Sequence, residues 1–211
     1  SNPTYSGPPR AAEIDVTEGT WLSIDVSPDG QTLIFDLLGD LYLLDIAGGA
    51  ARSLTSGLAW DIQPRFSPDG KQVVFISDRA GGDNVWVMTL ATGALKQITK
   101  ESFRLLNSPV WHPNGQFIAA KKHFTTSRSL GTGEIWLYDA TLPAPSDGVE
   151  LVARPNKNYQ KELGEPAFSA DGETLFYTQS ATSGNTFIYH DDSHGGLFQI
   201  KQLDLKTGET D

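Results

Sequence analysis

The sequence contains no cysteine among its 211 residues, which excludes a disulfide framework, thiolate chemistry and a cysteine-ligated metal site. No apolar stretch approaches the roughly 18–20 residues that a membrane-spanning helix needs. Basic residues are few, because 16 Lys and Arg stand against 26 Asp and Glu and give a formal net charge of −10. This balance argues against nucleic acid and anionic membranes as partners, since both bind clustered Lys and Arg.

The start of the chain also lacks a targeting segment. A signal peptide has a basic n-region followed by an apolar h-region, and SNPTYSGPPR has neither. A signal peptide has therefore been removed or never existed, and we expect residues 1–12 to form an unpacked leader. The remaining residues, 13–211, are numerous enough to enclose one sizeable hydrophobic core.

A four-residue turn motif that ends in Gly occurs four times in the chain. It reads SPDG at 27–30 and 67–70, HPNG at 112–115 and SADG at 169–172. Pro presets φ at the first central position, Asp or Asn tolerates the next one, and Gly adopts a positive φ without steric cost. The third residues of successive motifs are 40, 45 and 57 positions apart, which indicates a repeating unit of about 40 residues.

Short segments rich in Val, Ile, Leu and aromatic residues surround each copy of the motif. In the second copy QPRF precedes the turn, and QVVFIS, NVWVMTL and LKQIT follow it. Such short segments, bounded by Gly, Pro, Asp and Asn, are typical of strands rather than helices. The sequence therefore predicts an all-β fold, and units of four antiparallel strands predict a β-propeller. We expect four blades, at about residues 20–56, 60–100, 106–153 and 163–211.

The second unit, QPRFSPDGKQVVFISDRAGGDNVWVMTLATGALKQIT at 63–99, resembles the repeat of TolB-type β-propellers, a relative of the WD-type blade. The first unit departs from this pattern, with DLLGDLYLL where the Ser-Asp-Arg corner would stand. More narrowly, residues 18–70 are similar to the propeller that precedes the catalytic barrel in a group of bacterial amidohydrolases. These resemblances imply a periplasmic or secreted protein, and a ring of about six or seven blades of which this chain supplies four.

A partial ring exposes one side of its first blade and one side of its last blade, which favours aggregation or pairing. We therefore expect the chain to associate with itself through these exposed blade faces, to pair with a missing propeller or catalytic remainder, or to sit in a larger assembly. A protein or peptide ligand is a further expected partner.

Few residues suggest catalysis or metal binding. His190 and His194 lie four positions apart in HDDSH, with two carboxylates between them, and these are residue types that bind metals. The flanking Ser, Gly and aromatic residues favour a hairpin loop, so recognition at the loop tip and a solvated or interdomain loop are the alternatives. There is no Gly-x-Ser-x-Gly elbow and no His-x-His pair. We predict no catalytic residue, no metal site and no cofactor on this chain.

The corner after the second turn contains Asp78 and Arg79, followed by two glycines. Both residues are polar enough to suggest an active-site loop. Because the corner belongs to a repeating unit, we interpret them as an ion pair or a cap that shapes the connection between two strands.

Propeller ligands usually bind at the channel mouth, where loops join the last strand of one blade to the first strand of the next. Trp21 and Trp60 precede two of these first strands, so they are candidates for lining a ligand site. The same loops carry four basic residues in an otherwise acidic chain: Lys100, Arg104, Lys157 and Lys161. They would bind an acidic partner or a peptide carboxylate, or they are scattered solvated side chains.

Three functions remain open, and none places catalysis on this chain. The first is a non-catalytic propeller domain of a larger amidohydrolase-type hydrolase, used for scaffolding, protein interaction or control of substrate access. The second is a free-standing envelope binding protein of the TolB kind. The third is the propeller of a prolyl-oligopeptidase-like peptidase, in which the channel selects substrates by size.

Overall fold

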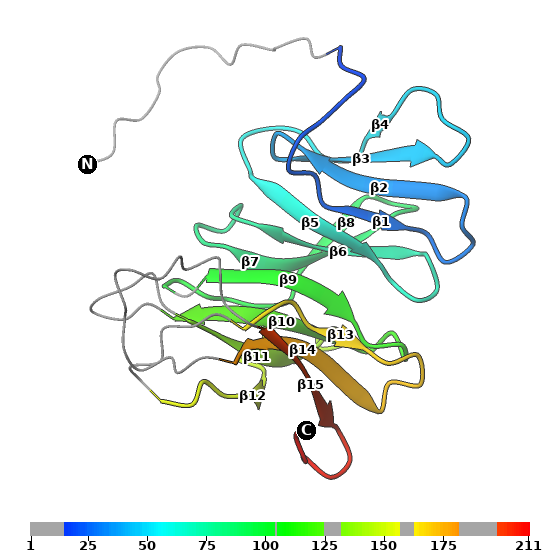
Figure 1. Cartoon of the computed structure of the whole chain (residues 1–211). Coiled ribbons are helices and arrows are strands. Elements are labelled where there is room, and N and C mark those ends of the chain that lie inside the picture. Colours follow the sequence, from blue (N-terminus) through cyan, green and yellow to red (C-terminus); the bar gives the residue numbers. More distant parts are fainter. Residues whose placement is uncertain (1–14, 104, 125–131, 157–162, 182–197) are drawn as a thin grey trace, which may run out of the picture.

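The structure is a computed structural model that describes residues 15–103, 105–124, 132–156, 163–181 and 198–211. These residues form four antiparallel sheets that follow one another in chain order, from blue to red in Figure 1. No helix occurs in the described part of the chain, and the all-β prediction is confirmed. The predicted leader, residues 1–12, lies outside the described residues.

Each sheet is one blade. Blade one comprises β1 (Ile24–Val26), β2 (Thr32–Leu37), β3 (Asp40–Asp45) and β4 (Arg52–Ser53). Blade two comprises β5 (Asp61–Phe66), β6 (Gln72–Ser77), β7 (Asn84–Thr89) and β8 (Ala94–Gln97). Blade three comprises β9 (Leu105–Trp111), β10 (Phe117–Phe124), β11 (Thr132–Asp139) and β12 (Val149–Val152). Blade four comprises β13 (Ala167–Phe168), β14 (Thr174–Ser180) and β15 (Phe198–Asp204).

The strands of every blade lie side by side in chain order. The first strands of successive blades contact each other, β1 with β5, β5 with β9 and β9 with β13. They are therefore the inner strands of sheets arranged around a common axis, which is the architecture of a partial β-propeller. Blade four has three described strands where four were expected, and Thr210 begins a fourth through a bridge to Leu203.

The repeated turns share one hydrogen-bond pattern, which explains why the motif recurs. In blade two the Ser67 hydroxyl donates to the Asp69 carboxylate at 2.6 Å. Gly70 has a φ of 70°, where most side chains would strain the backbone. In blade three His112 replaces the serine, and its Nδ1 accepts the N–H of Asn114 at 3.1 Å. The predicted turns are confirmed, and in blade three the His112 ring caps the turn in place of the serine.

The hydrophobic core lies between the blades, because alternate side chains of a strand point to opposite faces of its sheet. The layer between blades one and two contains Ile34, Leu41, Phe66, Val73, Phe75 and Met88. The layer between blades two and three contains Val74, Ile76, Val85, Val87, Ile98, Leu106, Trp111, Ile118, Ala120 and Tyr138. The layer between blades three and four contains Ala119, Ile135, Leu163, Leu175, Tyr177 and Leu203.

Polar side chains also reach from one blade to the inner strand of the next. The buried Asp36 carboxylate accepts the N–H of Ser23 at 2.9 Å and, across the blade junction, the N–H of Gln63 at 2.7 Å. The Gln63 side chain accepts the N–H of Ser108, in blade three, at 2.6 Å. Gln63 and Ser108 have φ of 56° and 52°, at bulges where the inner strand shifts register. These bonds satisfy backbone groups that the bulges release, and they join three consecutive blades.

Candidate functional site

The crossover end of the propeller is the end at which the outer strand of one blade connects to the inner strand of the next. It consists of the connections 54–60 and 98–103 and the corners 38–39 and 78–83. Hydrogen bonds hold these segments together. The N–H of Asp61 donates to the Gly39 carbonyl at 2.8 Å, and the N–H of Trp60 donates to the Asp78 carboxylate at 2.8 Å.

The corner of blade two is fixed by a buried ion pair. Nη2 of Arg79 lies 2.7 Å from both carboxylate oxygens of Asp61, a residue that is 1% exposed. Nε of Arg79 donates to the Ser77 hydroxyl at 2.9 Å. The guanidinium also lies 5.4 Å from the ring centre of Phe75 and 5.3 Å from that of Trp86. The interpretation of Asp78 and Arg79 as a cap and an ion pair is confirmed, since each holds a neighbouring strand connection in place.

Asn84, the first residue of β7, fixes the connection between blades two and three. Its Nδ2 donates to the carbonyls of Gly82 and Glu101, at 2.9 and 3.0 Å. Its Oδ1 accepts the N–H of Glu101 at 2.6 Å and the hydroxyl of Thr99 at 2.8 Å. Asn84 is buried, so its amide must be satisfied within the protein, and these four bonds use both of its donors and both of its acceptor sites. They fix the backbone of this connection.

The position of Trp60 is fixed by the hydrogen bond of its backbone N–H to Asp78 and by the packing of its ring on Gly39. The corner of blade one is a two-residue turn, with φ of 54° at Leu38 and 87° at Gly39. A Cβ at Gly39 would lie 2.5 Å from the Trp60 ring, so the indole packs directly on the glycine backbone. Half of the side chain, 53%, nevertheless remains exposed. Trp21, the other tryptophan predicted to line a site, is fully exposed three residues before β1.

Further apolar side chains at the crossover end were not anticipated from the sequence. Leu58 is fully exposed in the connection that also carries Trp60. Phe103 is largely exposed in the next connection, and Leu105, which begins β9, is half exposed. Apolar residues within a Gly-containing connection were the available signal for Leu58. With Trp60, these three residues are exposed apolar side chains at this end, within the described connections 54–60 and 98–103 and at the start of β9.

The predicted basic grouping is mostly outside the described residues. Lys100 is described and exposed in the connection between blades two and three. Arg104, Lys157 and Lys161 lie outside the described residues, so the predicted acidic ligand stays a prediction. His190 and His194 also lie outside them.

Crowded carboxyl groups accompany the apolar side chains of the crossover end. Burial raises the pKa of Asp40, the Thr55 hydroxyl opposes this shift by donating a hydrogen bond, and the nearby charge of Asp61 adds to it. Burial also raises the pKa of Asp83, and the neighbouring charge of Asp78 raises it further. The described corners of blades one and two are therefore acidic as well as apolar.

Blade three holds a set of mutually paired charges next to this end. Lys122 forms an ion pair with Glu101 and lies 4.1 Å from the ring centre of Trp136. Nε1 of Trp136 donates to Glu134 at 3.0 Å, and the Glu134 carboxylate lies 3.3 Å from Nε of Arg154. Each of these groups has a partner within the protein, so they pack the end of the blade rather than present a free acid or base.

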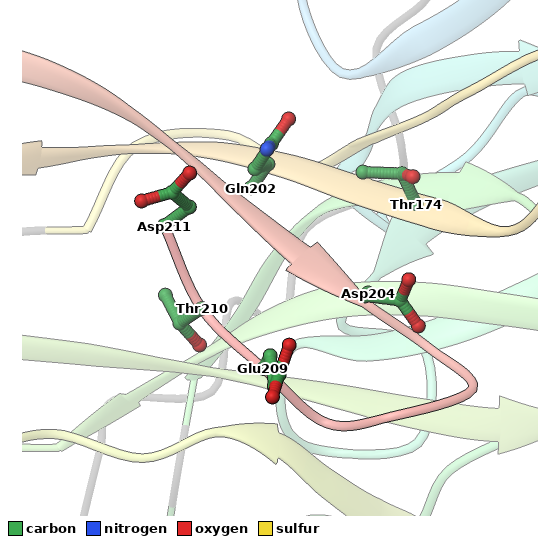
Figure 2. A pocket seen from close by; sticks show the side chains of 6 residues that line it. All are labelled: Thr174, Gln202, Asp204, Glu209, Thr210 and Asp211. Carbon is green, nitrogen blue, oxygen red and sulfur yellow. The ribbon is translucent and has the colours of Figure 1, made fainter.

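No group of three or more His, Asp or Glu side chains suited to a metal ion occurs within the described residues. The same residues contain no helix long and apolar enough to cross a membrane. A hollow of about 470 Å³ lies at blade four, far along the chain from the crossover residues of blades one and two. Figure 2 shows its lining side chains: Thr174, Gln202, Asp204, Glu209, Thr210 and Asp211. This lining contributes three carboxylates and contains no histidine or serine.

The repeat pattern of the sequence matches a known family. The model of the TolB beta propeller domain family matches residues 10–137, which is more than half of the chain and covers the first two blades and most of the third. The matched segment includes the connections and corners that form the crossover end.

Two curated relatives carry the name Tol-Pal system protein TolB. The protein of Helicobacter hepaticus is 29% identical over 165 residues, which cover 76% of this chain and 37% of that protein. The protein of Wolinella succinogenes is 30% identical over 179 residues, which cover 82% of this chain and 39% of that protein. The chain therefore spans less than half of the length of these relatives. None of these matches is an amidohydrolase, so the narrower resemblance stays a hypothesis.

Solved structures share the fold at lower identity. TolB from Acinetobacter baumannii is 22% identical with a TM-score of 0.57, over 92% of this chain and 45% of that one. A puromycin-hydrolyzing peptidase of Mycobacterium tuberculosis is 18% identical with a TM-score of 0.59, over 93% of this chain and 29% of that one. Sheets, turn motif and family model agree, and the chain belongs to the TolB beta propeller domain family.

Proposed function

We propose that this chain is a non-catalytic protein-interaction module that binds a partner protein at its crossover end. The relatives are named as proteins of the Tol-Pal system, and we extend this to the chain as a role in an envelope assembly of that kind. A periplasmic or secreted location follows from the same extension. The bound partner would be a protein of the assembly rather than a small substrate.

The exposed ring of Trp60 carries the proposal. Tryptophan is over-represented among residues that dominate binding energy, because a rigid ring buries a large area at low entropic cost. Here the ring rests on Gly39, and its backbone is tied to Asp78. A half-exposed indole on a rigid platform is pre-organised for contact, which limits the entropy lost on binding.

The surroundings of Trp60 fit a protein partner better than a substrate. Leu58 and Phe103 are further exposed apolar side chains, on this connection and on the next one. The polar groups nearby, such as Asp61 and Arg79, are engaged with each other. Exposed apolar side chains beside the paired Asp61 and Arg79 offer contact area to a protein partner.

The propeller of a peptidase is the second candidate, because a puromycin-hydrolyzing peptidase has a propeller of the same fold. A parent of the amidohydrolase type is the third, and it rests only on the resemblance of residues 18–70. Sequencing the source gene beyond the codon of Asp211 separates them. A Gly-x-Ser-x-Gly elbow would favour the peptidase, a His-x-His pair in a β/α stretch would favour the amidohydrolase, and a stop codon soon after the last blade would favour the binding protein.

The interaction is tested by titrating the 211-residue chain with the Pal protein encoded in the same genome. We expect calorimetry to show binding in the micromolar range, weakened at least about tenfold by Trp60→Ala. Leu58→Ala should weaken binding as well. Leu142→Ala is the matched control, because Leu142 is also exposed but follows β11 at the opposite end of the strands.

Absence of binding at about 100 µM would count against a Tol-Pal role. Binding that Trp60→Ala and Leu58→Ala leave unchanged would place the interaction elsewhere on the chain. Metal-dependent hydrolysis by the purified chain would contradict the non-catalytic assignment.

A further inference from the structure

The third repeated turn differs from the other three at its first residue. The turns of blades one, two and four begin with Ser27, Ser67 and Ser169, and the turn of blade three begins with His112. A serine hydroxyl keeps its charge near neutral pH, whereas an imidazole commonly gains a proton between about pH 8 and pH 5. Among the four copies of the motif, the turn of blade three therefore has a first side chain that can change its charge in this range.

Two hydrogen bonds define which ring nitrogen of His112 carries the hydrogen. The backbone N–H of Asn114 donates to Nδ1 at 3.1 Å, so Nδ1 must have a free lone pair. A neutral imidazole then carries its hydrogen on Nε2, which lies 2.9 Å from the Gly172 carbonyl and donates to it. The neutral ring thus caps its own turn and bonds to the turn of blade four.

Blade four also packs closely on this ring. A Cβ at Gly172 would lie 2.5 Å from Cε1 of His112, so the imidazole lies directly on the glycine backbone. The ring of Phe168, in β13, meets the imidazole edge to face with centres 4.9 Å apart. Phe117, in β10, meets it edge to face at 6.2 Å. The imidazole is therefore a well-packed contact between blades three and four.

The corresponding contact between blades one and two is apolar. Gly70 occupies the place of Gly172 in its turn, and a Cβ there would lie 3.4 Å from Cδ of Pro28. Proline has no side-chain group that takes up a proton. The contact at His112 thus differs in chemistry from its counterpart, although the two turns have the same shape.

The charged groups on the elements around the ring have partners of their own. They are Asp171, Glu173 and Lys206 around the turn of blade four, and Asp139 at the end of β11. Asp171 accepts a serine hydroxyl of its turn, Glu173 and Lys206 form an ion pair, and Asp139 accepts a threonine hydroxyl. Both ring nitrogens of His112 bond to backbone groups instead. A second N–H on the ring would therefore face the N–H of Asn114 rather than a carboxylate.

We propose that His112 is an acid-released latch between blades three and four. Protonation adds a hydrogen to Nδ1, which then opposes the N–H of Asn114 instead of accepting it, and the cap of the turn is lost. Turning the ring to separate these two hydrogens also moves Nε2 away from the Gly172 carbonyl. This inference is independent of the proposed function, because the turn at 112–115 lies at the opposite end of the strands from the crossover end.

The latch makes the stability of the chain depend on pH in one direction. The unfolded chain takes up the proton on His112 without losing a bond, whereas the folded chain loses the cap. On acidification the unfolded chain therefore binds more protons than the folded chain, and the free energy of unfolding falls as the pH falls.

Urea unfolding of the 211-residue chain between about pH 8 and pH 5 tests the proposal against His112→Asn, because asparagine offers the turn an acceptor that does not titrate. The other three histidines are present in both chains, so their titration cancels in the comparison. Over this range the unfolding equilibrium constant of wild type should rise about three- to tenfold relative to that of the variant, which corresponds to the net value of one hydrogen bond. His112→Ser, with the serine of the other turns, is a second variant that should give the same pH dependence.

NMR of the wild-type chain tests the latch without any substitution. At about pH 8 the ring should carry its hydrogen on Nε2, and the amide signal of Asn114 should shift together with the ring signals as the ring gains its proton. The amide of Gln72, which donates to the Ser67 hydroxyl in the turn of blade two, is the control and should not follow this titration.

Three results would overturn the proposal. The first is a ring that carries its hydrogen on Nδ1 at about pH 8, and the second is an Asn114 amide signal that does not follow the ring. The third is a ratio of unfolding equilibrium constants, between wild type and both variants, that stays constant from about pH 8 to pH 5.

Discussion

Replacing Arg79 with methionine should destabilise the chain by about 3 kcal/mol. Methionine keeps an apolar stem to pack near Phe75 and Trp86, but it leaves the Asp61 carboxylate without the group that binds both of its oxygens. Removing one partner of a buried pair costs about 3–5 kcal/mol. We take the lower end because the Arg79 side chain is 20% exposed, so water can approach the vacated position.

Thermal and urea unfolding, followed by tryptophan fluorescence, measure this effect. For a domain of this size about 3 kcal/mol corresponds to a Tm lower by roughly 6–12 °C. The control is Arg52→Met, an identical substitution at an exposed position of β4, which should stay within about 0.5 kcal/mol of wild type. Adding Asp61→Asn to Arg79→Met should restore part of the loss, because the buried charge is then gone. If Arg79→Met and Arg52→Met were equally stable, the corner would not depend on the ion pair.

Four further substitutions, one of them a control, test the turn and the crossover end. Gly39→Ala and the control Gly48→Ala both place a side chain at a φ near +90°, which should lower the free energy of unfolding by about 1–2 kcal/mol. Gly39→Ala should lower it further and shift the Trp60 fluorescence, because its Cβ would meet the Trp60 ring, whereas Gly48 has open space around it. Asn84→Ala should cost at least about 2 kcal/mol in urea unfolding, since it leaves buried backbone groups unpaired; a loss below about 0.5 kcal/mol would contradict the network. The Ser67 hydroxyl lowers the pKa of Asp69 below its ordinary 3.8, so the stability that this carboxylate contributes is present above that pH and is lost as pH falls through its folded pKa. Asp69→Asn should therefore differ from wild type most above about pH 4, and the two unfolding curves should converge toward about pH 2.

The blades were predictable because the information that sets them is local. The hydrogen bonds of each turn join residues within about five positions of each other. Ser67 can therefore donate to Asp69 independently of the rest of the fold. The strand β6 (Gln72–Ser77) coincides with the predicted QVVFIS segment, because an apolar run bounded by turn residues has few other solutions.

The connections between blades depend on register, which a single sequence leaves open. That Arg79 pairs with a carboxylate was expected, but its partner Asp61 lies 18 residues away and is brought near by the pairing of β5 with β6. The side chains of Asp36 and Gln63 accept backbone N–H groups of the next inner strand, at bulges where the backbone has a positive φ. The residue types at these bulges do not predict them.

The sequence indicated only some residues of the candidate site, because a residue's place in a connection can be read locally but its exposure cannot. Trp60 was named as a candidate for lining a ligand site from its position just before an inner strand, and that role stays a prediction. The structure adds that its ring packs on Gly39 and is half exposed. Leu58 was missed because an apolar residue in a short connection reads equally well as core.

Hydrogen–deuterium exchange of the chain with and without the Pal protein of its own genome tests the central claim most directly. The account predicts slower amide exchange in the connections 54–60 and 98–103 when Pal is bound, with no change in the turn at 112–115 at the opposite end of the strands. Protection confined to the repeated turns, with the two connections unchanged, would contradict the assignment of the crossover end as the binding surface.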